Sequence, residues 1–247
     1  MNTRIVVLAA GRGTRMGAEV PKPLVPIAGK PMVTHLVERV KLSGLDNMPV
    51  LVVAPDTKDL FEAEFGSEVE YAIQTEQLGT GHAVMSAGNL LGDADAVLVL
   101  YGDHPFISPE TMQKLAAQHD RDGATITMLT CTVPNFEGDY AGVKSWSRIV
   151  RDEDGEVVKD VQMKDATDEE LEITELNPCI FLFNRAWMLE ELPKLKNTNA
   201  QGEYYLTDLL KMAVDEGQKV STAPADVFDV IGVNTKEELE RAERLVA

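Results

Sequence analysis

The residues best suited to chemistry in this chain lie in a glycine-rich loop that follows a short apolar segment near the amino terminus. Gly11 and Gly13 open the loop, and the cations Arg15 and Lys22 follow them. Glycines lack the Cβ atoms that would keep backbone N–H groups away from a polyphosphate, and the cations add positive charge beside it. The spacing therefore predicts a loop that handles phosphate.

Two common phosphate-binding loops do not fit this segment. A P-loop requires Gly-Lys-Ser/Thr five residues after its first glycine, and Met16 stands at that place. A dinucleotide-binding loop leads directly into a helix, whereas Pro21 and Pro23 interrupt this one. Because a residue before proline is pushed out of the helical conformation, we expect a long extended loop.

The elements that must position this loop alternate along the chain. Apolar segments rich in β-branched residues indicate strands, and apolar residues on one face of a helical repeat indicate helices. The expected strands are 4–8, 50–54, 69–73, 96–101 and 124–133, and the clearest helices are 32–41 and 109–119. This alternation predicts an α/β fold with a doubly wound, mostly parallel sheet.

After about residue 143 the pattern changes to a hairpin, with strands at 147–151 and 156–161. We expect this antiparallel insertion to cover the open side of a ligand crevice at the carboxyl ends of the parallel strands. Residues 176–183 are expected as a further strand and residues 203–216 as a helix. The last helix should begin at a capping box formed by Thr235 and Glu238.

Charge limits the partners of the chain. Its 247 residues carry a net charge of -18, from 41 acidic and 23 basic residues, so no nucleic acid or membrane surface is expected to bind. A polyanion would need a local cationic pocket, supplemented by a divalent metal. The apolar run Ile5 to Ala10 is too short for a signal peptide or a membrane span, which favours a cytoplasmic location. Cys131 and Cys179 lack metal-site spacing and are expected as reduced thiols.

Five segments together resemble the sugar-phosphate nucleotidyltransferases, most closely the uridylyltransferase domain of the bifunctional N-acetylglucosamine-1-phosphate uridylyltransferases. They are the opening loop, Gln74 to Ala83, Tyr101-Gly-Asp103, Gly202 to Asp208 and Gly232-Val-Asn234. The resemblance runs from about residue 4 to 246 and implies a Rossmann-like nucleotidyltransferase fold. It also implies a reaction in which an oxygen of a sugar 1-phosphate attacks the α-phosphorus of UTP and pyrophosphate leaves.

The resemblance also assigns roles to residues. Arg15 and Lys22 would be catalytic cations on the phosphates, and Asp103 and Asn234 would bind Mg²⁺, which prefers oxygen ligands. Gln74 and the turn after it would read the base, whereas all four histidines are treated as structural. The residues expected to contact the nucleotide are Leu8, Ala9, Ala10, Gly11, Gly13, Gln74, Gly79, Thr80, Tyr101, Gly102 and Asp103.

The half that would bind the sugar departs from the family pattern. The usual Gly-Tyr-Gly-Arg-Ile is replaced by a segment with Ser147 at the second glycine, and Gln162 replaces a glutamate. Asn177 is kept, but Pro178 and Cys179 follow it in place of Thr-Gly. The expected sugar contacts are Ser147, Gln162, Asn177, Tyr205 and Thr207. Nucleotide chemistry is therefore better supported than the identity of the sugar.

We treat residues 1–247 as one domain with a nucleotide-binding half at about 1–135, a sugar-binding insertion and metal-binding segment at about 136–234, and a terminal helix at 235–247. The hexapeptide repeats of the bifunctional enzymes are not found in this sequence. We therefore expect neither acetyl transfer nor the trimer that those repeats build, and the oligomeric state stays open. Two alternatives remain. The first is a nucleotidyltransferase of the same fold that uses another nucleotide, as a cytidylyl- or guanylyltransferase does, or another sugar phosphate. The second is a non-catalytic module that senses nucleotides.

Overall fold

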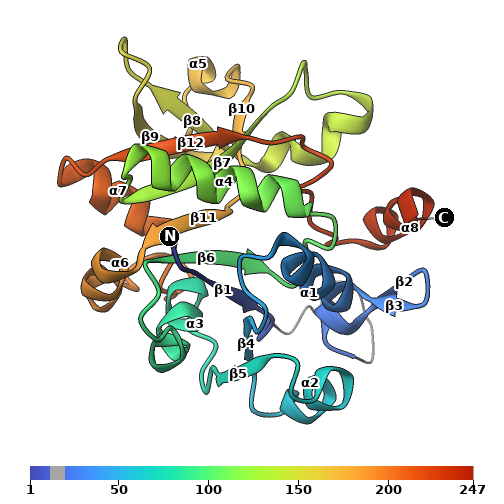
Figure 1. Cartoon of the computed structure of the whole chain (residues 1–247). Coiled ribbons are helices and arrows are strands. Elements are labelled where there is room, and N and C mark those ends of the chain that lie inside the picture. The colour runs from blue at the N-terminus through green and yellow to red at the C-terminus, as the bar shows by residue number, and fades with distance from the viewer. Residues whose placement is uncertain (12–19, 247) are drawn as a thin grey trace.

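A mixed sheet with helices on both faces forms the framework of the computed structural model (Figure 1). The structure describes residues 1–11 and 20–246. One half of the sheet consists of parallel strands in the order β5 (Glu70–Ile73), β4 (Val50–Val53), β1 (Thr3–Leu8) and β6 (Ala96–Tyr101). Helices cover these strands on both faces, which explains their nearly continuous apolar sequences. All four were predicted.

The other half of the sheet is largely antiparallel. β11 (Phe181–Asn184) runs antiparallel to both β6 and β7 (Ile126–Thr132), and β12 (Val220–Pro224) pairs with β7 in parallel. The sheet continues through β10 (Glu175–Asn177), β8 (Ser147–Arg151) and β9 (Val157–Val161). The predicted α/β class, parallel core and antiparallel hairpin are confirmed, and the hairpin extends the main sheet. A separate two-stranded sheet pairs β2 (Pro26–Ile27) with β3 (Lys30–Pro31).

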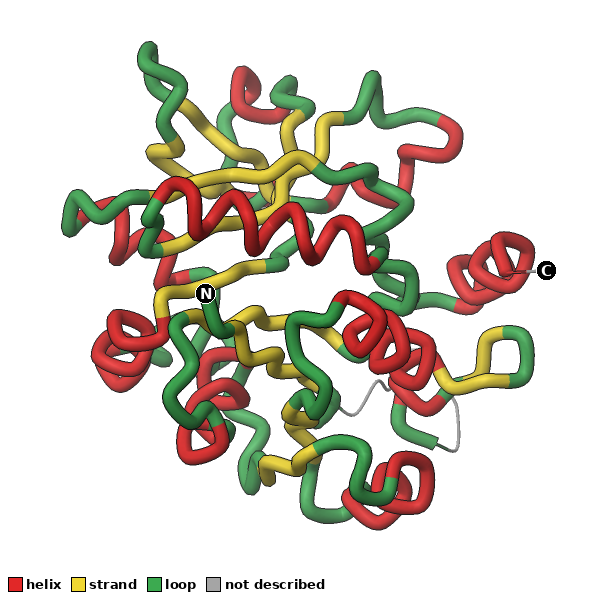
Figure 2. The backbone as a smooth tube through the Cα atoms, in the orientation of Figure 1, coloured by secondary structure: helices red, strands yellow, loops and turns green. Residues whose placement is uncertain are grey.

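Two apolar cores lie on opposite faces of the sheet, because side chains alternate along each strand. Ile5 and Val7 of β1 join the core under α1 (Met32–Ser43), α2 (Lys58–Phe65) and α4 (Pro109–Asp122). Val6 joins the core under α3 (Thr80–Ser86), α6 (Arg185–Glu191) and α7 (Asp208–Asp215). In Figures 1 and 2, α4 crosses in front of β7 and β12.

The short helices lie in the connections between these elements. They are η2 (Lys22–Leu24), η3 (Gly88–Leu90), η4 (Gly138–Ser145), η5 (Met163–Asp165), α5 (Asp168–Leu171) and η6 (Leu192–Lys194). The final helix α8 (Lys236–Val246) lies beside β2 at the right of Figure 1. Its capping box is confirmed, because the Glu238 carboxylate accepts from the Thr235 N–H and Thr235 Oγ1 accepts from the Glu238 N–H. Among the described residues, no helix is long and apolar enough to cross a membrane.

The single strand expected at residues 176–183 is wrong, because the chain forms two strands there. Leu176 of β10 pairs with Cys131, whereas Phe181 of β11 pairs with Met128 farther down the same strand β7. Between them Cys179 adopts a positive φ of 63°, and its N–H donates to the side-chain oxygen of Asn177 at 2.7 Å. This side-chain turn, together with a proline that lacks an N–H, breaks the strand.

The helix expected at residues 203–216 begins later, at Asp208. The backbone of the preceding residues is engaged elsewhere: the Tyr204 N–H donates to the Leu78 carbonyl at 2.7 Å, and the Tyr204 carbonyl accepts from the Gly81 N–H at 2.8 Å. The contact continues with a hydrogen bond that the backbone N–H of Leu206 donates to the side-chain hydroxyl oxygen of Thr80. Tertiary hydrogen bonds therefore replace the first turns of the expected helix.

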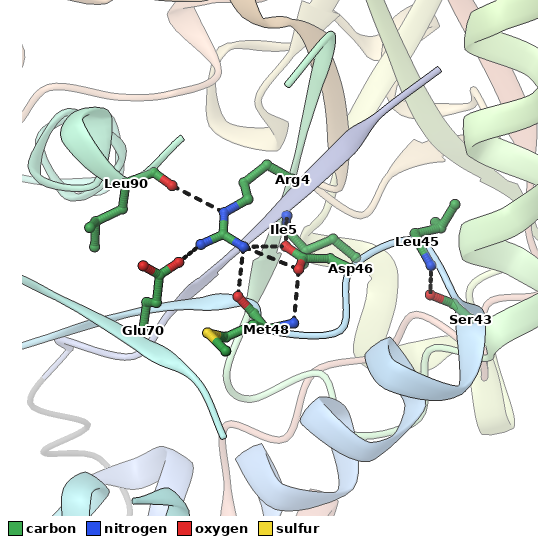
Figure 3. Close-up of polar contacts among 8 residues, drawn as sticks. All are labelled: Arg4, Ile5, Ser43, Leu45, Asp46, Met48, Glu70 and Leu90. Atoms are coloured by element: carbon green, nitrogen blue, oxygen red, sulfur yellow. Dashed lines mark hydrogen bonds and ion pairs between the residues drawn. The ribbon is translucent and has the colours of Figure 1, made fainter. Parts of the chain in front are cut away.

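A polar network fixes the start of β1 against its neighbours (Figure 3). The Arg4 guanidinium donates to the Asp46 carboxylate and to the carbonyls of Met48 and Leu90, and it forms an ion pair with Glu70. Asp46 also accepts from the Ile5 N–H at 2.8 Å. One arginine thus links β1 to the loop before β4, to β5 and to the connection before β6.

We predict that Asp46→Ala lowers the free energy of unfolding by about 2 to 4 kcal/mol, because it leaves the Arg4 charge and the Ile5 N–H with fewer partners in a poorly hydrated site. The Asp46 side chain is only 7% exposed. Urea unfolding followed by circular dichroism measures the effect. Lys58→Ala removes an exposed ion pair within α2 and serves as the control, with an expected change below about 0.5 kcal/mol. Equal effects of the two substitutions would contradict the importance of the network.

Candidate active site

A cavity of about 530 Å³ opens at the carboxyl ends of β1, β5 and β6, the edge at which parallel sheets commonly bind ligands. Eleven of the predicted residues line it: Leu8, Ala9, Ala10, Gly11, Lys22, Gln74, Gly79, Thr80, Tyr101, Asp103 and Asn234. These residues come from six separate segments of the chain. The fold therefore assembles most of the expected nucleotide-binding residues around one space.

The turn at residues 78–81 forms one wall of this cavity. The segment before α7 forms hydrogen bonds with this turn on the side away from the cavity. Gly79 has a φ of 102°, and a Cβ at this position would lie 2.7 Å from the Tyr204 carbonyl oxygen. Both the conformation and the close approach require glycine. The tertiary hydrogen bonds of Tyr204 and Leu206 thus fix the position of Thr80 and Gly79 at the cavity.

Two glutamine side chains line the same wall. The Gln74 amide nitrogen donates to the Gly79 carbonyl at 3.0 Å and lies 3.2 Å from His82 Nδ1, which accepts in the tautomer that carries its hydrogen on Nε2. This arrangement commits the nitrogen to the protein and leaves the amide oxygen for a ligand. Gln77 donates to the Ala10 carbonyl at 2.6 Å and ties the wall to the residues after β1.

Lys22, Asp103 and Asn234 form the polar centre of the cavity. The Lys22 ammonium donates to Asp103 Oδ2 and, at 2.7 Å, to Asn234 Oδ1. Asp103 follows β6, and its carbonyl accepts from the Val233 N–H at 2.9 Å, which draws the segment carrying Asn234 to the end of that strand. A carboxylate and an amide oxygen from distant segments thus converge on one cation.

Burial and charge set the protonation of the groups around this centre. Burial alone would raise the pKa of Asp103, whereas the charge of His104 in its protonated form at low pH and the Lys22 ammonium lower it, and the pKa falls below its ordinary value. Burial lowers the pKa of His104, so its imidazole is neutral at pH 7. Burial, together with Cys179 and Asp103, raises the pKa of Tyr101 well above its ordinary value, and the phenol stays protonated.

A second cavity of about 310 Å³ adjoins the first and shares Tyr101, Asp103 and Asn234 with it. Its other walls come from η4, from the hairpin, from the turn that separates β10 from β11 and from the segment that leads into α8. Ser147, Gln162 and Asn177, three of the five expected sugar contacts, line this cavity. The antiparallel half of the sheet thus brings three of the expected sugar contacts next to the polar centre.

Asn177 is largely engaged within the protein. Its amide oxygen accepts from the Cys179 N–H, and its amide nitrogen donates to Asp160 Oδ2 at 3.1 Å. Burial raises the pKa of Asp160 and raises that of the Cys179 thiol to about 12, so the thiol is not ionised at pH 7. The Ser147 hydroxyl is buried beside Asp160, where it partly offsets the rise in the pKa of that carboxyl. Ser147 lines the cavity, so a change at this position alters the wall that a ligand would contact.

Some expected residues lie elsewhere. Gly13 and Arg15 fall outside the described residues. Gly102 lies behind the cavity, where a Cβ would meet the Pro23 ring at 3.0 Å, and Tyr205 and Thr207 are not among the described residues that line either cavity.

The cavities are also lined by residues that the sequence analysis did not assign to the site. Among them, Gln77 and Glu203 line the first cavity, and His104 and Trp146 line the second. Gln77, Glu203 and His104 stand within or beside the quoted motifs, which is the signal that could have indicated them.

Comparison with known proteins agrees with this arrangement. Residues 5–215 match the model of the MobA-like NTP transferase domain. The chain is 42% identical over 245 residues to the bifunctional protein GlmU of Exiguobacterium sibiricum, covering 98% of this chain and 53% of that protein. It is 40% identical over 247 residues to the bifunctional protein GlmU of Clostridioides difficile, covering 100% of this chain and 52% of that protein.

The chain spans about half the length of the curated relatives it matches. The match of the family model to most of the chain, the whole-chain likeness to these relatives and the assembled cavities confirm the resemblance inferred from the motifs. The chain belongs to the family of MobA-like NTP transferase domains and is a nucleotidyltransferase.

Proposed function

We propose that this protein transfers a uridylyl group from UTP to a sugar 1-phosphate, with N-acetylglucosamine 1-phosphate as the first acceptor to test. A phosphate oxygen of the acceptor forms a bond to the α-phosphorus of UTP, and the bond from that phosphorus to the bridging oxygen breaks as pyrophosphate leaves. The observation that carries this proposal is the pair of adjoining cavities that share Tyr101, Asp103 and Asn234. Two phosphate-bearing ligands in these cavities would meet at the polar centre.

The donor set at that centre suits Mg²⁺. The Asp103 carboxylate and the Asn234 amide oxygen already converge on a cation, the Lys22 ammonium, and both are hard oxygen ligands. Bound to these two side chains, Mg²⁺ would neutralise charge on the phosphates and orient them. Lys22 supplies a further positive charge from the wall of the same cavity, and Arg15 is proposed to do so from the loop.

The proposed preference for uracil rests on the orientation of Gln74. Because its amide nitrogen is engaged by Gly79 and His82, its oxygen is the atom that can meet a base. That oxygen accepts hydrogen bonds, which suits the N3–H donor of uracil and not the unprotonated N3 of cytosine. His82 is therefore proposed as a positioning residue for Gln74.

The first experiment measures pyrophosphate release with UTP, CTP or GTP, Mg²⁺ and a panel of hexose and N-acetylhexosamine 1-phosphates. We expect release with UTP and N-acetylglucosamine 1-phosphate, and mass spectrometry should identify the matching UDP-sugar. Binding of UTP without release for any acceptor would favour a nucleotide-sensing module. Turnover with CTP or GTP in place of UTP would contradict the proposed base preference.

We predict that Asp103→Asn reduces kcat by roughly 10²- to 10³-fold, since the metal and the Lys22 ammonium both lose a charged partner at the reacting phosphates. Steady-state pyrophosphate release at saturating Mg²⁺ measures the loss. Asp56→Asn, at an exposed position, removes the same charge elsewhere and should keep full activity. A fully active Asp103→Asn enzyme would contradict the assignment of this carboxylate.

We predict that Ser147→Gly raises the KM for the acceptor by about 3- to 10-fold, because the substitution removes a polar side chain from the wall of the second cavity, where the acceptor is proposed to bind. The KM for UTP should stay unchanged, and initial-rate kinetics with each substrate varied separately gives both values. Ser67→Gly, at an exposed position, is the matched control. An unchanged acceptor KM, or an equal change for UTP, would contradict the role of Ser147.

A further inference from the structure

We propose that Lys22 is an internal cation that holds the metal site closed until it is displaced, so that metal entry and the release of Lys22 toward the phosphates are one coupled event. This inference rests on the proposed assignment of Asp103 and Asn234 as metal ligands. The observation that carries it is that the Lys22 ammonium contacts both of those oxygens at once.

A metal ion bound to both oxygens would need the space that the ammonium occupies. Lys22 Nζ lies 2.7 Å from Asn234 Oδ1 and is also hydrogen-bonded to Asp103 Oδ2, so it fills the position between the two side chains. Two cations in direct contact repel strongly in a site with little water. The Lys22 side chain is only 13% exposed and that of Asp103 21% exposed, so screening by solvent is limited. Binding of the metal therefore requires the ammonium to leave.

The displacement must take place in the side chain, because the backbone at Lys22 is held. The Leu24 N–H donates to the Pro21 carbonyl at 2.8 Å, and the Val25 N–H donates to the Lys22 carbonyl at 3.0 Å. The adjacent Pro23 is buried, and its ring packs against Gly102. The four-carbon stem of lysine can nevertheless carry its ammonium away from a fixed backbone.

Lys22 itself lines the cavity proposed for the nucleotide, so a displaced ammonium has phosphate oxygens within its reach once UTP is bound. Without nucleotide, an ammonium leaving Asp103 would lose its charged partner and regain only water. The protein alone should thus bind metal weakly, whereas nucleotide supplies a new partner for the lysine. Lys22 couples the two binding events in this way, in addition to its proposed action on the phosphates.

The experiment is a titration of the nucleotide-free protein with Mn²⁺, with free Mn²⁺ measured by electron paramagnetic resonance. We expect Lys22→Met to bind Mn²⁺ at least about tenfold more tightly than the wild type, because no ammonium competes for the two oxygens. Lys58→Met removes one positive charge from an exposed ion pair in α2 and controls for the change in net charge; its affinity should match the wild type. Adding Asp103→Asn to Lys22→Met should abolish the gain.

A second measurement needs no substitution and keeps the inference testable if Lys22→Met does not fold. A brief reaction with acetic anhydride, with and without Mn²⁺, is followed by mass spectrometry of the peptides that carry Lys22 and Lys58. We expect Mn²⁺ to increase acetylation of Lys22 severalfold and to leave Lys58 unchanged.

Equal Mn²⁺ affinities of wild type and Lys22→Met, or unchanged Lys22 labelling at saturating Mn²⁺, would overturn the displacement. Pyrophosphate release by the wild type would in that case still support the proposed function. A gain in Mn²⁺ affinity for Lys22→Met without any turnover of UTP by the wild type would instead support the displacement of Lys22 and contradict the proposed reaction.

Discussion

Charge compensation around Asp103 is the constraint on which the site depends. A largely buried carboxylate at the end of β6 is costly without a cation beside it, and Lys22 at the start of η2 provides one. The backbone bond between Val233 and Asp103 brings a third segment to the same point. The start of η2, the end of β6 and the segment before α8 are therefore held together around one charge pair.

The mixed sheet explains why two cavities meet there. The parallel half places the ends of β1, β5 and β6 along one edge, and β11 then pairs antiparallel with β6. The antiparallel strands beyond it carry Ser147 and Asn177 opposite each other in register, next to Tyr101 at the end of β6. Variation in the antiparallel half can change the second cavity without altering the residues that line the first.

Patterns local in sequence predicted the fold well, and contacts between distant segments explain what was missed. The apolar runs of β1, β4 and β6 and the helical stripe of α1 are encoded by their own residues. The end of the strand at Asn177 and the late start of α7 depend instead on hydrogen bonds of Cys179 and Tyr204, which no local pattern indicates.

The candidate site follows the same division. Motif residues such as Lys22, Asp103 and Gln74 could be assigned from the sequence, because a family pattern marks them, and the structure places all three on the first cavity. Asp160 could not be assigned from the sequence, because its place in the site depends on its burial and on its hydrogen bond with the Asn177 amide. His82 was expected to be structural, and its contact with Gln74 supports the proposal that it positions that amide.

The contact between residues 78–81 and 203–206 has a consequence for how the molecule can be divided. The first cavity needs Glu203 and Asn234 as well as the strands near the amino terminus. A fragment cut after residue 135 would keep β1, β4, β5 and β6 and the turn at residues 78–81, but it would lack the segment that supports this turn and one of the two converging oxygens. The smallest portion of this chain able to enclose the proposed nucleotide thus extends at least to Asn234, and complementation between two separately expressed pieces would have to restore the support of that turn across the break.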